Sequence, residues 1–409
     1  MADFYQNGSI ATLHNLGQRS TEDLENELRS FMDHKPMGLV LPSLYSELKT
    51  DALEDIVQKL KPVDYLEQII IGLDRATKDE YKHALKYFSR LPQDHTVLWN
   101  DGPRLRKIDA LLESQNLAPK EPGKGRNVWF CFGYALACKR AKAIALHDCD
   151  IKTYDRSMLA RLIYPIANPN FNYEFSKGFY SRIADNKLNG RVCRLLVTPL
   201  IRSLKTVCKG HDDLLDYLDS FRYPLAGEFA MSAQVLNDIR IPSDWGLEMG
   251  VLSEMKRNYN ENHICQVDIA DVYDHKHQIL SPEDKAKGLS KMSIDIAKSL
   301  YRKLAIEGQV FTPELFRTLK ATYYRIALDM VKRYSADAAL NGLMYDNHAE
   351  GLSVELFAEN IIEAGHNFMD NPMDTPFMPS WNRVISAFPN ILEELKAAVE
   401  EDTKEYFEQ

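Results

Sequence analysis

The sequence has few cysteines, no excess of positive charge and no long apolar run. Its 409 residues include six cysteines, and no two of them have CxxC spacing. A disulfide framework is therefore not expected, and we expect a reducing compartment, the cytoplasm. No uncharged apolar run approaches the length of a membrane span, and residues 1–16 have neither the basic nor the apolar region of a signal peptide. We expect no membrane partner.

The charge balance is acidic. The chain has 50 basic and 59 acidic residues, which gives a formal net charge of −9. Proteins whose main partner is a nucleic acid or an anionic membrane usually carry the opposite balance, so we expect neither. A local basic pocket for a phosphorylated small molecule remains open. With 45% hydrophobic residues the chain has enough apolar material for a core.

The first third of the chain alternates short apolar runs with amphipathic segments. The pattern predicts strands at 38–42, 67–73, 96–99 and 143–146, and helices at 51–60, 78–90, 101–112 and 126–141. Such alternation is typical of an α/β fold with a mostly parallel sheet wrapped by helices. Ligands of such sheets bind beyond the carboxyl ends of the strands, which here are followed by 42–47, 74–77 and 147–150.

Changes in pattern divide the chain into three parts. We expect an amino-terminal extension over 1–35, a main domain over 36–284 and a helical region over 285–409. The middle of the main domain contains short β-like runs at 173–180 and 192–197. Amphipathic spacing near the carboxyl end predicts helices at 313–335, 353–366, 380–388 and 390–407. These carry no cluster of catalytic residues, so we expect them to be structural and to help form a homodimer.

The strongest local signal is the pair of carboxylates after the fourth predicted strand. Asp148 and Asp150 directly follow the buried run 143–146. If the chain turns there, both can reach one cation, and oxygen ligands suit Mg²⁺ or Mn²⁺ held together with substrate phosphates. The alternative is two solvated acids in a turn.

Two further segments could complete such a site. Gly123, Lys124 and Gly125 allow close backbone approach and place an ammonium near a phosphate, although the pattern is not a P-loop. His275 or His277 could supply a metal ligand. The alternatives are an exposed loop for the first segment and a polar surface turn for the second.

Two other segments place charge in unusual surroundings. Glu228 and Glu248 each lie close after a glycine in an apolar stretch, where they could contact sugar hydroxyls or pair with arginines. The basic segment 187–192, preceded by Lys177 and Arg182, could bind a small anion. Its alternative is a solvated hairpin.

Taken in order, these residues resemble the retaining glucosyl-3-phosphoglycerate synthase family. The matching pieces are GSIATLHNL (8–16), LVLPSLYSE (39–47), Asp74, PGKG (122–125), HDCD (147–150), KGFYSR (177–182), NGRV (189–192), AGEFA (226–230), WGLEMG (245–250) and YDHKHQ (273–278). The resemblance implies a GT-A fold with a nucleotide-binding half (36–150), an acceptor half (151–284) and a helical carboxyl-terminal extension. It also implies transfer of glucose from a nucleotide sugar to D-3-phosphoglycerate with a divalent cation, Mg²⁺ or Mn²⁺.

The resemblance also implies a role for individual residues. The donor-binding residues would be Pro42, Ser43, Leu44, Glu47, Asp74, Gly123, Lys124, Asp148 and Cys149. The metal ligands would be Asp150 and His275, with Asp148 supporting the ribose or the metal. The catalytic residues would be Asp150, Lys124 and Glu248, which faces the donor sugar. The acceptor-binding residues would be Asn189, Gly190, Arg191 and Val192.

Two positions depart from the family's pattern. Cys193 stands where the family often has threonine, and Tyr273 stands where mycobacterial-like members have an arginine that can grip the acceptor phosphate. These departures leave other acceptors open, such as glycerate. The sequence does not distinguish a uridine from a guanosine nucleotide, or glucose from mannose. A nucleotide-sugar-binding protein without catalysis is the remaining alternative.

Overall fold

The computed structural model describes the chain except for short segments. The described residues are 6, 8–17, 19–119, 122–210, 212–243, 246–275, 288–372 and 377–407. The boundary predicted at 284, Trp245 and the alternative metal ligand His277 lie outside them. The division of the chain into three parts stays a prediction.

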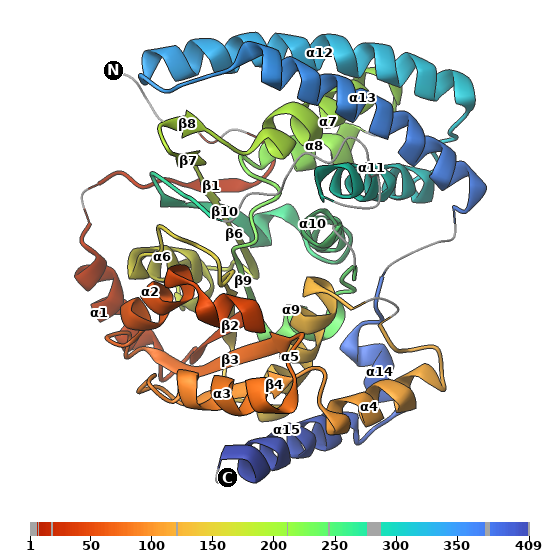
Figure 1. Cartoon of the computed structure of the whole chain (residues 1–409). Helices are drawn as coiled ribbons and strands as arrows, with labels where there is room; N and C mark the ends of the chain where they lie inside the picture. The colour runs from red at the N-terminus through yellow and green to blue at the C-terminus, as the bar shows by residue number, and fades with distance from the viewer. Residues whose placement is uncertain are drawn as a thin grey trace.

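A central sheet organises the fold (Figure 1). Its strands, in spatial order, are β1 (Ala11–Leu13), β10 (Ile264–Ala270), β6 (Phe175–Tyr180), β9 (Phe229–Ser232), β5 (Ala143–Leu146), β2 (Met37–Leu44), β3 (Leu66–Asp74) and β4 (His95–Trp99). Only β9 runs antiparallel to its neighbours β5 and β6, and the other pairs are parallel. The predicted mostly parallel α/β sheet with carboxyl-terminal helices is confirmed.

Helices cover both faces of the sheet. They are α1 (Thr21–Phe31), α2 (Asp51–Leu60), α3 (Lys78–Phe88), α4 (Pro103–Glu113), α5 (Lys124–Cys138), α6 (Arg156–Ala167), α7 (Thr198–Val207), α8 (Asp212–Ser220), α9 (Ala233–Asp238), α10 (Leu247–Asn258), α11 (Gly288–Ile306), α12 (Pro313–Leu340), α13 (Asn347–Asp370), α14 (Trp381–Ala387) and α15 (Ile391–Phe407). Short helical turns also span Tyr45–Lys49, Val192–Val197 and Glu261–His263. A two-stranded hairpin consists of β7 (Ile183–Ala184) and β8 (Lys187–Leu188).

The strands in the centre of the sheet are buried on both faces, which explains their continuous apolar runs. In β2, Leu39 and Leu41 pack with α2, α3 and α6, whereas Val40 packs on the other face with α5. Adjacent side chains of a strand point to opposite faces, so one run serves two cores. All four strands predicted in the first third of the chain are confirmed, with bounds shifted by up to two residues.

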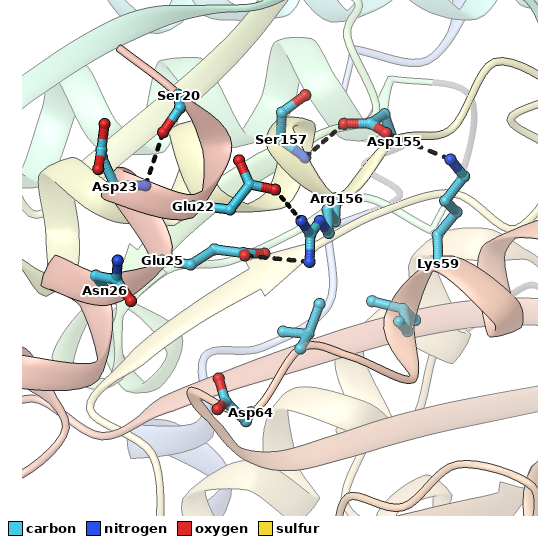
Figure 2. A network of polar contacts seen from close by, with 12 residues as sticks. Ser20, Glu22, Asp23, Glu25, Asn26, Lys59, Asp64, Asp155, Arg156 and Ser157 are labelled. Carbon is cyan, nitrogen blue, oxygen red and sulfur yellow. Dashed lines mark hydrogen bonds and ion pairs between the residues drawn. The ribbon is translucent and has the colours of Figure 1, made fainter.

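Ion pairs attach α1 to the neighbouring helix α6 (Figure 2). The Arg156 guanidinium, at the start of α6, contacts Glu22 and lies 3.3 Å from the buried Glu25 carboxylate. The preceding Asp155 accepts a hydrogen bond from the Ser157 amide at 2.9 Å and lies 3.6 Å from Lys59. Residues 21–31 therefore pack on α6, and β1 adds a strand to the edge of the sheet.

The prediction of a strand at 192–197 is wrong. These residues form a π-helical turn that continues into α7, and all six are buried. A short apolar run without alternation does not distinguish a buried strand from a buried helix turn. The middle of the chain also contains α7 to α10, for which the sequence analysis predicted no helices.

The carboxyl-terminal helices lie at two ends of the molecule (Figure 1). At one end α13 packs on α11 and α12, and α12 packs on α7; at the other end α15 packs on α4, α5 and β4. The Trp129 and Trp381 rings stack at 4.2 Å between centroids and join α14 to α5. The Arg104 guanidinium in α4 contacts three carboxylates of α15, from Glu401, Asp402 and Glu405.

Two sequence-based exclusions can be compared with the structure. All six cysteines are free, as expected without a disulfide framework. None of the helices in the described ranges combines the length and the apolar character needed to cross a membrane.

Candidate active site

A cavity of about 790 Å³ opens at the carboxyl ends of β2, β3 and β5. It gathers every residue to which the family resemblance gives a role. Those predicted for the donor, the metal or catalysis are Pro42, Ser43, Leu44, Glu47, Asp74, Gly123, Lys124, Asp148, Cys149, Asp150, Glu248 and His275. Those predicted for the acceptor are Asn189, Gly190, Arg191 and Val192.

The carboxyl end of β2 turns around the buried carboxylate of Glu47. One oxygen of Glu47 accepts hydrogen bonds from the Leu44 amide at 3.0 Å and from the Ser43 hydroxyl at 3.1 Å. Burial raises the pKa of Glu47 to about 7, and the nearby Asp150 carboxylate adds to that shift against the Leu44 and Ser43 hydrogen bonds. Glu47 thus fixes the turn that follows the strand, and its carboxylate is only partly ionised near neutral pH.

The carboxyl end of β3 places Asp74 deep in the same cavity. Its Oδ1 accepts a hydrogen bond from the Asn100 side chain at 2.8 Å. Burial raises the pKa of Asp74 to about 6, and the Asn100 contact opposes this shift. A buried carboxylate with one oxygen engaged can accept a hydrogen bond from a ligand with the other.

Lys124 is the first residue of α5 and lies between two carboxylates. Its Nζ is 2.7 Å from Asp148 Oδ1 and 3.4 Å from Glu248 Oε1. Burial lowers the pKa of Lys124, but the charges of Asp148 and Glu248 outweigh it and the net pKa is raised. The ammonium therefore stays charged at the amino terminus of a helix, which favours binding of an anion.

A glycine makes this contact possible. A Cβ at Gly227 would lie 2.4 Å from Asp148 Oδ2 and 2.9 Å from Lys124 Nζ. A Cβ at Gly125 would lie 2.1 Å from the Pro242 carbonyl oxygen. The glycines that flank these charges are required by close approach rather than by backbone flexibility.

Asp150 and His275 form the candidate metal site. The distance from His275 Nδ1 to Asp150 Oδ2 is 3.6 Å, and residues 151 and 275 form a β-bridge that holds the two segments together. Burial raises the pKa of Asp150, but His275 and Lys124 more than offset this, so that it lies below its ordinary value. Asp148 instead pairs with Lys124.

This donor set fits Mg²⁺ or Mn²⁺ in one particular way. Within the described part of the chain no three His, Cys, Asp or Glu side chains converge as a complete metal site. Mg²⁺ is usually bound through one or two carboxylates together with substrate phosphates, and carboxylate oxygens suit Mn²⁺ as well. Asp150 and His275 are therefore adequate protein ligands only when a phosphorylated substrate supplies the others.

The predicted acceptor loop follows the hairpin of β7 and β8. Gly190 has φ of +75°, and a Cβ there would lie 3.1 Å from the Tyr223 hydroxyl, so glycine is required. The Arg191 guanidinium is 3.5 Å from Glu350 Oε1, at the start of α13. The sequence offered two interpretations of segment 187–192, a hairpin and an anion site. The two are compatible, because the segment begins in the hairpin and continues into the lining of the cavity.

The two departures from the family's pattern have structural explanations. The Tyr273 hydroxyl donates a hydrogen bond to the buried Glu228 at 2.7 Å, and Tyr180 donates to the other oxygen at 2.8 Å. The rings of Tyr180 and Tyr273 stack at 3.7 Å between centroids. Among the described residues the partners of Glu228 are thus two tyrosines, and no arginine pairs with it. Cys193 is buried and is not among the lining residues.

The basic segment before the acceptor loop divides between the core and the cavity. Lys177 is buried in β6, its ammonium donates to the Ala226 carbonyl, and burial lowers its pKa to about 8. Arg182 lines the cavity, and its buried Nε has no hydrogen-bond partner among the described residues.

Sequence reasoning missed a group of lining residues that come from distant segments. They include Arg75, Asn127, Tyr180, Arg194, Tyr223, Leu225, Ser243, Leu289, Lys291, Met292, Ile296 and Glu350. Tyr180 belongs to a segment that carried the family resemblance, and Arg194 lies just beyond one. The residues from α11 and α13 had no signal, because nothing in their spacing distinguishes them from packing or solvated residues.

Comparisons with known proteins agree with this geometry. No protein-family model matches the chain. A glucosyl-3-phosphoglycerate synthase of Persephonella marina is 46% identical over 405 residues, which cover 99% of this chain and 100% of the relative. One of Methanococcoides burtonii is 38% identical over 410 residues, with 99% of each chain covered.

Crystal structures of glucosyl-3-phosphoglycerate synthase from Mycobacterium tuberculosis share the fold. The complex with Mn²⁺, UDP-glucose and phosphoglyceric acid has a TM-score of 0.52 at 20% identity, over 72% of this chain and 88% of that chain. The complex of the same enzyme with Mg²⁺ and UDP has a TM-score of 0.51 at 21% identity, over 72% and 86%.

The fold and the full-length relatives together define a glycosyltransferase of the GT-A type. Sequence identities of 46% and 38% over 99% of this chain also identify the family. The chain belongs to the glucosyl-3-phosphoglycerate synthase family, whose members are hexosyltransferases.

Proposed function

We propose that the protein transfers glucose from UDP-glucose to D-3-phosphoglycerate, with retention of configuration and with Mg²⁺ or Mn²⁺. The observation that supports this most is the convergence of Lys124, Asp148, Asp150, His275 and the loop at Arg191 in one cavity. The two relatives of full length bear the name of this activity. The mycobacterial structure that shares the fold binds UDP-glucose, phosphoglyceric acid and Mn²⁺.

The nucleoside lies at the carboxyl ends of β2 and β3 in this proposal. Pro42, Ser43, Leu44 and Cys149 line its site, and Glu47 fixes the turn. Asp74 reads the base, since its free oxygen can accept a hydrogen bond from an imide N–H such as that of uracil. A guanine N1–H could donate to the same oxygen, so the choice of uridine is supported by the UDP-glucose bound in the mycobacterial enzyme rather than by Asp74.

The diphosphate lies between the amino terminus of α5 and Asp150. Gly123 permits close approach, and Lys124 meets the phosphate oxygens while Asp148 supports the ribose or the metal. A divalent cation held by Asp150, His275 and the diphosphate would stabilise the negative charge that develops there. The Lys124 ammonium acts on the same charge, and it is already oriented before the reaction.

Transfer then takes place beside Glu248, which faces the donor sugar. The bond from the anomeric carbon to the diphosphate oxygen breaks, and the acceptor hydroxyl oxygen bonds to the same carbon from the same face. The proton of that hydroxyl passes to the departing diphosphate oxygen. No carboxylate is assigned as a nucleophile, because the Glu248 carboxylate lies 3.4 Å from Lys124 and Glu228 is engaged by two tyrosines.

The acceptor lies against Asn189, Gly190, Arg191 and Val192. The Arg191 guanidinium forms charge-assisted, forked contacts with the phosphate or carboxylate of the acceptor. The positive φ of Gly190 brings the backbone close to it.

A matrix of donors and acceptors tests this function. UDP-glucose, GDP-glucose and GDP-mannose are each combined with 3-phosphoglycerate, glycerate or water, and nucleotide release and product mass are measured. We expect the mass of glucosyl-3-phosphoglycerate with UDP-glucose as the best donor. Release only with glycerate, or only with GDP-mannose, would contradict the proposed substrates. Nucleotide binding without release would contradict catalysis.

Two further properties belong to the proposal. We assign the protein to a reducing compartment such as the cytoplasm, which the six free cysteines support. We also assign it a homodimer, which amphipathic helices with exposed apolar residues such as Leu340 and Leu352 support. Light scattering at micromolar concentration measures the mass, and a monomer would contradict the dimer.

A further inference from the structure

Arg194 attaches the backbone of the acceptor loop to the carboxyl-terminal helices. Its guanidinium donates to the Asn189 carbonyl at 2.8 Å and to the Leu188 carbonyl at 3.2 Å. The guanidinium also donates to Glu350 Oε2 at 3.1 Å. The backbone amide of Arg194 donates to the Gly190 carbonyl at 3.1 Å. One side chain thus holds both residues that precede the glycine of the loop.

The surroundings of Arg194 fix its orientation. Its guanidinium lies 4.9 Å from the Tyr334 ring centroid and 5.7 Å from that of Tyr345, and it donates to the Tyr345 hydroxyl at 3.4 Å. Tyr334 belongs to α12, and Tyr345 lies just before α13. The Arg194 side chain is only 8% exposed, so rotation away from these partners would leave a buried charge without compensation.

Glu350 connects this buried contact to the cavity. It is buried, lines the cavity, and its two oxygens divide between Arg191 at 3.5 Å and Arg194 at 3.1 Å. One carboxylate from α13 therefore orients the guanidinium proposed to meet the acceptor and the guanidinium that holds the loop.

A second attachment lies at the tip of the hairpin. The Met344 amide donates to the Asn186 carbonyl at 2.8 Å, and Asn186 donates to the Gly342 carbonyl at 3.4 Å. The connection between α12 and α13 thus contacts the hairpin on the side from which the acceptor loop leaves.

We propose that Glu350 and Arg194 are positioning residues that set the affinity of this enzyme for its anionic acceptor. The inference rests on the proposed function and assigns the helices α12 and α13 a part in it. Arg194 holds the carbonyls of Leu188 and Asn189, and Glu350 orients Arg194 and Arg191 together. Loss of either leaves the donor side intact, because none of these contacts reaches Lys124, Asp148 or Asp150.

The variants Arg194→Lys and Glu350→Gln test the inference. In Arg194→Lys the forked contacts are lost and the charge is kept. We expect the dissociation constant of 3-phosphoglycerate, titrated into protein saturated with UDP and Mn²⁺, to rise about tenfold or more. Glu350→Gln should raise it severalfold, and the acceptor KM should follow in both. The dissociation constant of UDP and the UDP-glucose KM should change less than about twofold.

Two matched controls separate positioning from stability. Arg202, in α7, pairs with Asp219 at 3.1 Å. The buried Glu254 pairs with Arg240 at 3.0 Å and with Lys303 at 3.4 Å. None of these residues is among those that line the cavity. Arg202→Lys and Glu254→Gln should lower the melting temperature without changing acceptor affinity. Tyr345→Phe, which removes one hydrogen bond, replaces Arg194→Lys if that variant does not fold.

The outcomes distinguish this inference from the proposed function. No transfer to 3-phosphoglycerate by the unaltered protein would overturn the proposed function. Transfer with unchanged acceptor affinity in both loop variants would overturn the positioning role alone. Equal weakening of UDP and acceptor would also overturn it, because a general loss of structure would explain that result.

Discussion

The proposed donor side and the proposed acceptor side of the cavity are built by different means. On the donor side Asp74 ends β3, and Asp148 and Asp150 follow β5, strands whose positions are set by the hydrogen bonds of the sheet. On the acceptor side Arg191 belongs to a loop whose backbone accepts a hydrogen bond from Arg194, and its guanidinium contacts a carboxylate 159 residues away in sequence. Side chains at strand ends are positioned by the core, whereas the loop is positioned by polar contacts between distant segments.

The two sides also differ in charge. The proposed donor side gathers carboxylates around the ammonium of Lys124, which suits a metal ion and a diphosphate. On the proposed acceptor side the guanidinium groups of Arg191 and Arg194 contact Glu350, and Arg182 lines the same cavity. Replacements on each side should therefore affect different ligands, and the following changes test that separation in order of expected effect.

Asp150→Ala should abolish transfer. It removes the carboxylate proposed to hold the metal, and losses of about a hundredfold or more follow when stabilisation of developing charge is removed. Activity is measured as release of nucleotide, and Mn²⁺ affinity by calorimetry in the presence of UDP. Asp155→Asn is the control, because Asp155 caps α6 by accepting from Ser157 and asparagine can do the same. Full activity of Asp150→Ala in a chelator would refute the metal assignment.

Arg191→Ala should raise the acceptor KM and leave the UDP-glucose KM nearly unchanged. Truncation of a buried charged contact costs on the order of 2–4 kcal/mol. Steady-state kinetics with each substrate varied measures the effect. Arg75→Ala, on the donor side of the same cavity, provides the contrast, since it should change only the donor KM. An opposite pattern for Arg191→Ala would place the loop in the donor site.

Asp74→Asn should change the pH dependence of stability. The pKa of Asp74 is raised from 3.8 to about 6, so the folded state retains a proton that the unfolded state releases. The free energy of unfolding therefore falls as pH rises through this range, by on the order of 2 kcal/mol at higher pH. Asparagine removes this slope and can still accept from Asn100. Thermal unfolding between pH 4 and 8 measures this pH dependence of stability. In the same variant UDP should bind severalfold more weakly.

Because Glu47 titrates in an overlapping range, Asp74→Asn should reduce the total slope rather than abolish it, and an unchanged slope would assign the proton to another group. Glu47→Gln is the companion variant, because the pKa of Glu47 is raised to about 7 and its slope should extend to higher pH.

Arg104→Ala should lower stability and leave both substrates unaffected. It removes the guanidinium that contacts Glu401 at 3.1 Å and Glu405 at 2.7 Å and leaves the buried Asp402 uncompensated. Because the Arg104 side chain is 27% exposed, we expect a loss of about 1 kcal/mol in denaturant unfolding. Arg104→Lys should be milder. A change in the acceptor KM would contradict the separation between α15 and the acceptor loop.

The difference between the two sides explains what the sequence could predict. The positions of Asp148 and Asp150 could be predicted, because acids that directly follow a buried strand of a parallel sheet lie at its carboxyl end, where ligands bind. The same applies to Asp74, which follows the run of three isoleucines. Lys124 and His275 could be placed only through the family resemblance.

Other features had no local signal. Glu350 lies in the first turn of α13, three residues after Asn347. An acid at such a position is ordinarily solvated and interacts favourably with the helix dipole. Only the folded structure brings it to Arg191 and Arg194. The error at 192–197 has a different cause, since the pattern of apolar residues fitted two structures equally well. Strand β1 has three residues, too few for a periodic pattern.

The stacked pair Trp129 and Trp381 gives the molecule an intrinsic optical reporter. Their indoles are inclined by 20°, each N–H donates to a carbonyl, and Gly133 leaves room for the second ring. Two indole transition dipoles this close couple, so the pair should contribute a two-signed band to the circular dichroism spectrum. That band arises only while α14 is seated on α5, the helix that starts at Lys124. Its disappearance during a titration with denaturant would report release of the carboxyl-terminal segment separately from melting of the sheet.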